Sequence, residues 1–325
     1  MRLKFSVFIH NVGSCSDRYC PSYGPAFSTD QLLDRIASIP EITGVDLVAT
    51  QDLMEEASSL AAKIKAHDLT TVSIATDIFA QEKWKKGSFS NPDPTVRADA
   101  VAHGKEVMDL TEELGSDLLT IWPGQDGHDY LFESDYIAAR EWFIQGIREL
   151  CDYKPKMRVG IEYKIKEPRT HSLVSTVGTT LLMTQATERQ NCEVILDYGH
   201  SLMGYENPAE SLAILQQFGN GPGHIHINDN YRLWDDDMIV GSVRTLEFVE
   251  FFVWLERIKY NGWLTIDQYP YREDGRDAVA ESALWVNALE KIATSVDTTE
   301  LQRVLDAHDG VESSRFMRSL LVGPA

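Results

Sequence analysis

Short runs of apolar residues alternate with longer amphipathic stretches along most of the chain. This alternation is typical of parallel βα units. Eight apolar runs are expected to be strands: residues 3–9, 44–48, 71–75, 117–122, 158–163, 193–197, 223–228 and 262–267. The spacing of apolar positions between them predicts helices, among them 94–115, 134–153, 172–189, 245–258 and 278–292.

Eight βα units, without a dinucleotide-type glycine fingerprint after the first strand, predict a closed (β/α)₈ TIM barrel rather than a doubly wound sheet. We expect one catalytic domain over residues 1–295 and a short helical tail over 296–325. Two connections, 76–91 and 230–244, are longer than a helix requires. Loops of that length on a barrel tend to build the functional site.

Charge and composition argue against nucleic-acid and membrane partners. The chain has 50 acidic and 30 basic residues, a net charge of −20, which argues against a nucleic-acid partner. No apolar stretch is long enough for a membrane span, and the first residues do not resemble a signal peptide. The four cysteines form no CxxC pair, which favours thiols in a reducing compartment. We therefore expect a cytoplasmic protein without a membrane partner.

Polar residues mark the ends of four successive predicted strands: Glu162, Asp197, His226 and Asp267. In a barrel the carboxyl ends of the strands meet at one mouth. Three carboxylates and an imidazole suit Mn²⁺, Mg²⁺ or Co²⁺ better than a structural zinc ion, which prefers thiolates. A single carboxylate at a strand end is usually a helix cap or a loop ion pair, but four neighbouring strands seldom share that ending for unrelated reasons. The sequence therefore predicts a divalent metal site, with Mn²⁺ preferred.

A second group of polar residues surrounds the first. His200 follows Asp197 by three residues, and Asp235 and Asp237 lie in the long loop after the seventh strand. These three side chains, sharing Asp197, would suit a second cation. The alternative is a solvated acidic loop, so one or two ions are expected.

Three further residues are candidates for substrate contact. Lys164 lies two residues beyond Glu162 on the same side of the strand; it would donate a hydrogen bond to a substrate oxygen, or it is a counter-ion to the acidic cluster. Trp122 ends the fourth strand and Phe89 lies in the loop after the third. Both would line a sugar site with flat faces, or belong to the core. His224 is expected to face the helices in a structural role.

Taken together, these motifs resemble the xylose isomerase-like TIM-barrel superfamily over residues 71–289. The motifs that carry the resemblance are Glu162-Tyr-Lys164, Glu167-Pro-Arg169, Asp197-x-x-His200, His224-Ile-His226-Ile-Asn228, Trp234-Asp-Asp-Asp237 and the segment 79–122. Histidine at 226 makes the ligand set more similar to rhamnose isomerase and the ketose 3-epimerases. Two departures from xylose isomerase are expected to matter: residues 45–52 lack the histidine of a His-Asp pair, and we expect no long C-terminal arm.

The resemblance implies aldose–ketose isomerisation of a small sugar, with Lys164, Glu162, Asp267 and His200 as catalytic candidates. A ketose 3-epimerase is the main alternative, in which one metal suffices and Glu162 or Asp267 removes a carbon-bound proton. A third reading is carbon–carbon cleavage of a 3-keto-C-glycoside, as in the large subunit of C-glycoside deglycosidases, which needs a small partner subunit. A non-catalytic sugar-binding module is the remaining alternative. Relatives commonly assemble as dimers or tetramers, so a homo-oligomer is implied.

Overall fold

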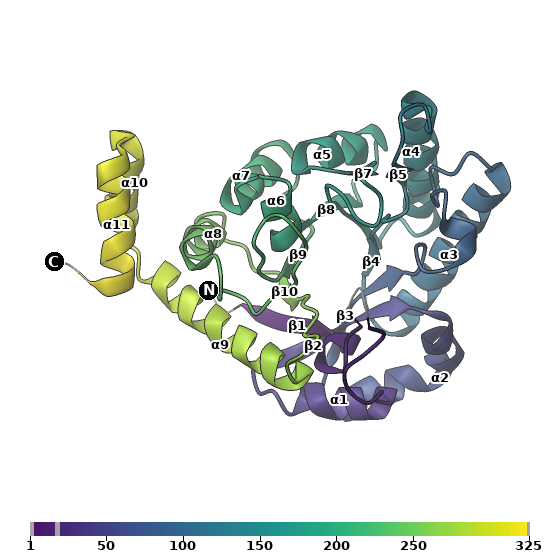
Figure 1. Ribbon diagram of the computed structural model, residues 1–325, viewed down its shortest axis with the longest axis horizontal. Helices are drawn as coiled ribbons and strands as arrows, with labels where there is room; N and C mark the ends of the chain where they lie inside the picture. Colours follow the sequence, from purple (N-terminus) through teal and green to yellow (C-terminus); the bar gives the residue numbers. More distant parts are fainter. Residues whose placement is uncertain (1–2, 17–19, 324–325) are drawn as a thin grey trace.

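Eight parallel strands close into a barrel (Figure 1) in the computed structural model, which describes residues 3–16 and 20–323. Their order around the barrel is β1-β10-β9-β8-β6-β4-β3-β2. The bounds are β1 (Lys4–Phe8), β2 (Ile42–Ala49), β3 (Thr70–Thr76), β4 (Leu118–Ile121), β6 (Arg158–Glu162), β8 (Cys192–Asp197), β9 (His224–Ile227) and β10 (Trp263–Ile266). All eight predicted strands and the (β/α)₈ barrel are confirmed.

Helices surround the barrel and cover its outer surface (Figure 1). They are α1 (Thr29–Ala37), α2 (Gln51–Ala66), α3 (Pro94–Glu113), α4 (Tyr136–Tyr153), α5 (Val177–Ala186), α7 (Pro208–Phe218), α8 (Thr245–Arg257) and α9 (Gly275–Thr294). Shorter elements are α6 (Tyr198–Met203), η1 (Ile9–Val12) and η2 (Glu82–Trp84). Helix starts follow local chemistry: the side chain of Asp93 accepts a hydrogen bond from the Thr95 amide at 2.8 Å, with Pro94 in the first turn.

The helix predicted at 172–189 begins later than expected. Thr176 caps α5 by accepting a hydrogen bond from the Thr179 amide, so the helix starts at Val177. Before it, β7 (His171–Ser172) pairs antiparallel with β5 (Gly127–His128). Apolar periodicity does not reveal this pairing because β5 belongs to a different loop.

The barrel interior contains a polar layer beneath the mouth. Its buried members are Ser6, Asp46, Ser73, His224 and Thr265. His224 Nε2 lies 2.6 Å from Thr265 Oγ1, and its ring lies edge-on to that of His226 at 5.1 Å. The expectation that His224 faces the helices is therefore wrong. Residues two apart on a strand point to the same face, so both histidines point inward.

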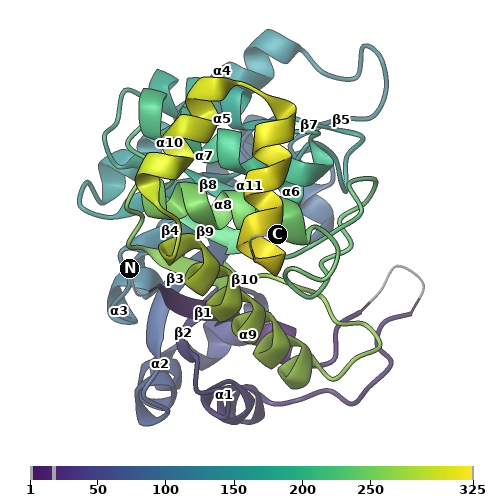
Figure 2. The ribbon, with the colours of Figure 1, turned by 90° about the vertical axis from the view of Figure 1, so that its left-hand side faces the viewer.

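Two further helices follow the barrel, α10 (Thr298–Ala307) and α11 (Gly310–Val322). They stand to one side of the barrel beyond α9 in Figure 1, and Figure 2 shows them next to each other. Val304 is buried, and Leu301, Met317 and Leu320 pack against the hydrophobic core. The domain boundary at residue 295 stays a prediction. Within 3–16 and 20–323, none of the helices has both the length and the apolar character needed to cross a membrane.

Candidate metal centre

The four predicted ligands come from four neighbouring strands. Glu162 ends β6, Asp197 ends β8, His226 lies in β9, and Asp267 directly follows β10. Asp197 and His226 are register partners across the β8–β9 pair, so their side chains point to the same face. The strand order β6-β8-β9-β10 therefore places the four side chains at one sector of the barrel mouth.

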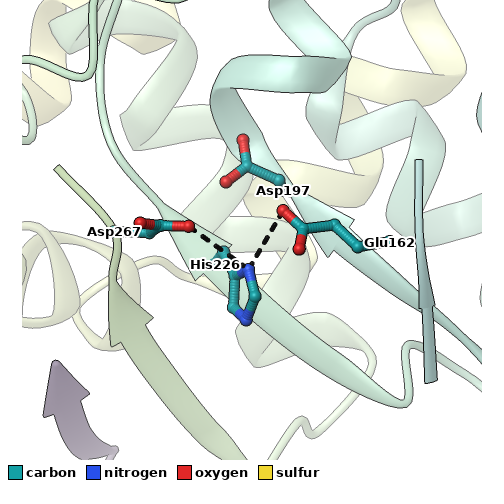
Figure 3. Close-up of side chains that lie close together, drawn as sticks. All are labelled: Glu162, Asp197, His226 and Asp267. Atoms are coloured by element: carbon teal, nitrogen blue, oxygen red, sulfur yellow. Dashed lines mark ion pairs between the residues drawn. The ribbon is translucent and has the colours of Figure 1, made fainter. Parts of the chain in front are cut away.

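The ligand atoms of these four residues all lie within 4.8 Å of one another. His226 Nδ1 lies 3.2 Å from Glu162 Oε1 and 3.6 Å from Asp267 Oδ2, and Asp197 completes the cluster (Figure 3). Neither ring nitrogen of His226 has a hydrogen-bond partner, although the residue is fully buried. Among the described residues, no second cluster of three or more potential ligands is this compact.

The electrostatics of this cluster favour a cation. Burial raises the pKa of Asp197 to about 6 and that of Asp267 to about 7, and neighbouring carboxylates add to both shifts. For Glu162 burial acts in the same direction, but His226, His200 and Lys164 together outweigh it and lower the pKa. A divalent ion would offset the repulsion among the three carboxylates. Three oxygens and one imidazole nitrogen fit Mn²⁺, Mg²⁺ or Co²⁺.

Hydrogen bonds orient the candidate ligands. Asn228 Nδ2 donates to Asp197 Oδ2 at 3.0 Å, and the His200 amide donates to Asp197 Oδ1 at 2.7 Å. Asn11 Nδ2 donates to Asp267 Oδ1 at 3.4 Å. Sequence reasoning gave Asn228 no role at the site, but its position two residues after His226 already indicated an inward side chain.

Lys164, His200 and Asp235 form a second, differently organised group. Lys164 Nζ lies 2.8 Å from Asp235 Oδ2, and His200 Nε2 lies 3.1 Å from the same oxygen. His200 Nδ1 lies 3.3 Å from Glu162 Oε1 and so connects this group to the four-ligand cluster. Lys164 Nζ also lies 3.0 Å from Glu167 Oε2.

The second cation site predicted from His200, Asp235 and Asp237 is not assembled as a ligand cluster in the described residues. The physical reason is that Asp235 Oδ2 already contacts the Lys164 ammonium and His200 Nε2. Asp237 lines a cavity at the barrel mouth, together with Asp235 and His200. Its backbone oxygen accepts a hydrogen bond from the Tyr269 amide at 3.0 Å. Burial and the neighbouring Asp235 raise the pKa of Asp237 well above its usual value.

A cavity of about 520 Å³ opens above the cluster. Trp122 lines it as predicted, with Lys164 Nζ 5.4 Å from its ring centroid. Sequence reasoning missed several aromatic lining residues, namely Phe8, Phe79, Tyr269 and Tyr271. A signal existed for Tyr269, which lies two residues beyond Asp267. Phe79 lies in the loop after β3, where strand alternation cannot predict the direction of a side chain.

Phe89 is not at this cavity, and its predicted substrate contact is wrong. The side chain is fully buried and packs against Phe143 of α4, with ring centroids 5.8 Å apart. The reason lies in the flanking residues. The amides of Ser88 and Ser90 both donate to the buried carboxylate of Asp126, at 3.1 and 2.6 Å. This anchor fixes the loop so that Phe89 points into the core.

Comparison with known proteins places the chain in a family. The family described as xylose isomerase-like TIM barrel matches residues 36–289. The xylose isomerase of Thermus thermophilus is 27% identical over 213 residues, which cover 63% of this chain and 54% of that protein. The xylose isomerase of Dinoroseobacter shibae is 27% identical over 173 residues, covering 51% and 40%. The chain thus spans about half the length of the curated relatives it matches.

Solved structures give a more complete overlap at lower identity. A D-tagatose 3-epimerase-like protein has a TM-score of 0.71 at 20% identity, covering 90% of this chain and 98% of that one. D-psicose 3-epimerase from Clostridium cellulolyticum H10 has a TM-score of 0.69 at 14% identity, covering 90% and 99%. A 3-keto-D-glucoside 4-epimerase from E. coli has a TM-score of 0.69 at 16% identity, covering 88% and 100%. At these identities the likeness shows the fold.

Proposed function

This chain belongs to the xylose isomerase-like TIM-barrel family, and we propose that it is a divalent-metal-dependent enzyme that isomerises or epimerises a small sugar next to a carbonyl group. The observation that carries the proposal is the compact set of three carboxylates and one imidazole, of which Glu162 and Asp267 line the cavity. A purely sugar-binding module would not need the buried Lys164 beside a complete set of four candidate ligands.

Glu162, Asp197, His226 and Asp267 would hold the cation. When bound, it would supply positive charge to stabilise the oxyanion that forms as a proton leaves the neighbouring carbon. Glu162 and Asp267 are carboxylates close enough to the cavity to take and return that proton. Lys164, which also lines the cavity, would donate a hydrogen bond to a substrate oxygen.

Of the reactions consistent with the family, the proton-transfer epimerase with one cation has the stronger geometric support. Asp235 interacts with Lys164 and His200, so a second cation would have to displace a lysine ammonium. The second candidate is the two-metal aldose–ketose isomerase. It is supported by the xylose isomerases among the relatives in sequence.

The deciding experiment reconstitutes the metal-free protein with Mn²⁺, Mg²⁺ or Co²⁺ and follows aldoses, ketoses and 3-keto-glycosides by NMR in D₂O. A proton-transfer reaction introduces solvent deuterium at the reacting carbon, whereas a hydride shift does not. Cleavage of a carbon–carbon bond in a 3-keto-C-glycoside would indicate the lyase instead. Failure to bind these ions at micromolar concentration, or to convert any sugar, would contradict the proposal and leave a binding module.

Assembly, metal identity and location belong to the same proposal. We expect Mn²⁺, a cytoplasmic location and a homodimer or homotetramer. An exposed apolar loop supports the oligomer: Tyr130, Leu131 and Phe132 are 77%, 83% and 100% exposed. A two-fold interface would bury this patch on both copies. Light scattering after gel filtration measures the mass, and copurification of a small second chain would favour the deglycosidase-type complex.

A further inference from the structure

The mouth of the barrel is divided into two halves of opposite character. The charged half is formed by β6, β8, β9 and β10, which present the four candidate ligands. The other half is formed by β1, β2, β3 and β4. Its cavity-lining side chains are mainly apolar: Phe8, Val48, Ala75, Phe79 and Trp122.

Two aromatic side chains lie at the boundary between these halves. The Lys164 ammonium lies 5.4 Å from the ring centroid of Trp122, and Phe79 is in edge-to-face contact with the same ring, with centroids 4.7 Å apart. Phe8 packs edge-on against the candidate ligand His226, with centroids 5.2 Å apart. A molecule held at the charged cluster therefore meets an aromatic wall directly beside it.

Two of the polar side chains that line the apolar half, His10 and Gln125, have a partner within the protein. His10 Nε2 lies 2.8 Å from the Tyr269 hydroxyl, and burial keeps its pKa low, at about 4, so the ring is neutral. Gln125 Nε2 donates to the Phe79 carbonyl at 3.2 Å. Each contact uses one polar atom of a side chain, and the rest of the lining on this side of the cavity is mainly apolar.

The apolar half of the cavity favours apolar substrate groups over hydroxyl groups. A free sugar carries a hydroxyl on nearly every carbon, and a hydroxyl buried against an apolar wall loses hydration without gaining a partner. An apolar group at the same wall gains from leaving water. The cavity of about 520 Å³ also lies within the range of roughly 300–1,000 Å³ typical of sites for drug-sized ligands.

We propose that the substrate is a sugar bearing an apolar, planar substituent such as an aryl glycoside, with the sugar at the four-ligand cluster and the substituent against Val48, Ala75 and Phe79. This proposal rests on the proposed sugar-converting function and names its substrate class. The aromatic ring would pack on Phe79 and Trp122, in the edge-to-face or offset arrangement that aromatic pairs prefer.

The test compares the binding of phenyl β-D-glucopyranoside and methyl β-D-glucopyranoside to the Mn²⁺-loaded full chain by calorimetry. We expect the phenyl probe to bind at least ~10-fold more tightly, the lower end of what apolar contacts supply in discrimination. Val48→Thr keeps the shape but adds a hydroxyl to the wall. It should reduce the preference severalfold while leaving methyl-probe affinity and bound Mn²⁺ unchanged. Val311→Thr, on the exposed face of α11, is the matched control and should change nothing.

Turnover of the 3-keto forms of the same two glycosides, and of free ketoses, separates the two proposals. Equal binding of the two probes, or faster conversion of free ketoses than of any phenyl-bearing sugar, would overturn the aryl-substituent proposal and leave the isomerase proposal intact. Preferential phenyl binding without conversion of any sugar would support the ligand class and contradict the enzymatic function. Phe79→Ala provides a second variant, and it should also weaken phenyl-probe binding.

Discussion

The ammonium group of Lys164, just beyond β6, lies 2.8 Å from Asp235 Oδ2 in the loop after β9. His200 Nε2 reaches the same oxygen at 3.1 Å. Although burial opposes it, the charges of Lys164 and His200 hold the pKa of Asp235 well below its usual range. Burial also opposes charge on His200, yet Asp197 and Asp235 raise the pKa of its imidazole to about 9. Asp235 therefore acts as a buried counter-ion between two cationic groups.

Asp235→Asn should leave one metal ion per chain, because Asp235 pairs with Lys164 and His200 and is not needed by the four-ligand cluster. We expect kcat/KM to fall by ~10–100-fold, the usual cost of removing an orienting partner. Elemental analysis after gel filtration measures the metal, and Asp236→Asn is the control, since its side chain binds only the nearby Tyr231 amide in the described contacts. Two ions in the wild type and one in Asp235→Asn would establish the two-metal arrangement instead.

His226→Ala should reduce Mn²⁺ affinity by more than ~100-fold, because loss of a ligand costs more than loss of an orienting partner. His226 contributes the nitrogen to the cluster, and both ring nitrogens are without a hydrogen-bond partner. Isothermal titration measures the affinity. His308→Ala, on the exposed C-terminal tail, should bind Mn²⁺ like the wild type. Unchanged affinity in His226→Ala would exclude this residue as a ligand.

Gly199→Ala should weaken metal binding without touching a ligand. A Cβ at Gly199 would overlap Asn228 Oδ1, and Asn228 donates the 3.0 Å hydrogen bond that orients Asp197. Displacement of Asn228 should cost ~10–100-fold in Mn²⁺ affinity. Gly178→Ala, in α5 with open space around the added Cβ, is the control and should leave affinity unchanged while stabilising the fold by ~0.4–1 kcal/mol. Equal metal affinity in the two variants would refute a positioning role for Asn228.

Mn²⁺ affinity should fall as the pH drops through about 7 and then about 6. In the metal-free protein, burial raises the pKa of Asp267 to about 7 and that of Asp197 to about 6. Below those values protons compete with the cation for the same oxygens. The raised values also mean that the metal-free native state binds these protons more tightly than the unfolded chain. Its stability should therefore decrease as the pH rises from about 4 to about 7. Titrations across this range check both trends, and a pH-independent affinity would count against carboxylate ligation.

Truncation after Ser295 should leave a folded barrel that still binds one metal ion, because the cluster comes entirely from β6, β8, β9 and the start of the loop after β10. The melting temperature should fall, since α10 and α11 pack Val304, Leu301 and Met317 onto the protein. Calorimetry and metal analysis of the shortened chain measure both. Loss of metal binding in a folded truncation would show that the tail belongs to the catalytic unit.

The sequence alone determined the barrel and the cluster of four candidate ligands, for a geometric reason. Strand positions follow from apolar runs, and a closed parallel barrel brings the carboxyl ends of successive strands to one mouth. Glu162, Asp197, His226 and Asp267 could therefore be placed together without any knowledge of loop conformation. The error over His224 was one of strand geometry, because residues two apart share a face.

Tertiary structure alone decided which loop side chains reach the site. Phe89 is buried because the distant Asp126 binds the amides on both sides of it. Asp235 pairs with Lys164 across 71 positions of sequence, so the acidic loop after β9 supplies a counter-ion rather than a free ligand. The division of the mouth into charged and apolar halves likewise depends on the order of strands around the barrel. These contacts join distant segments through packing and charge, for which local sequence patterns contain no signal.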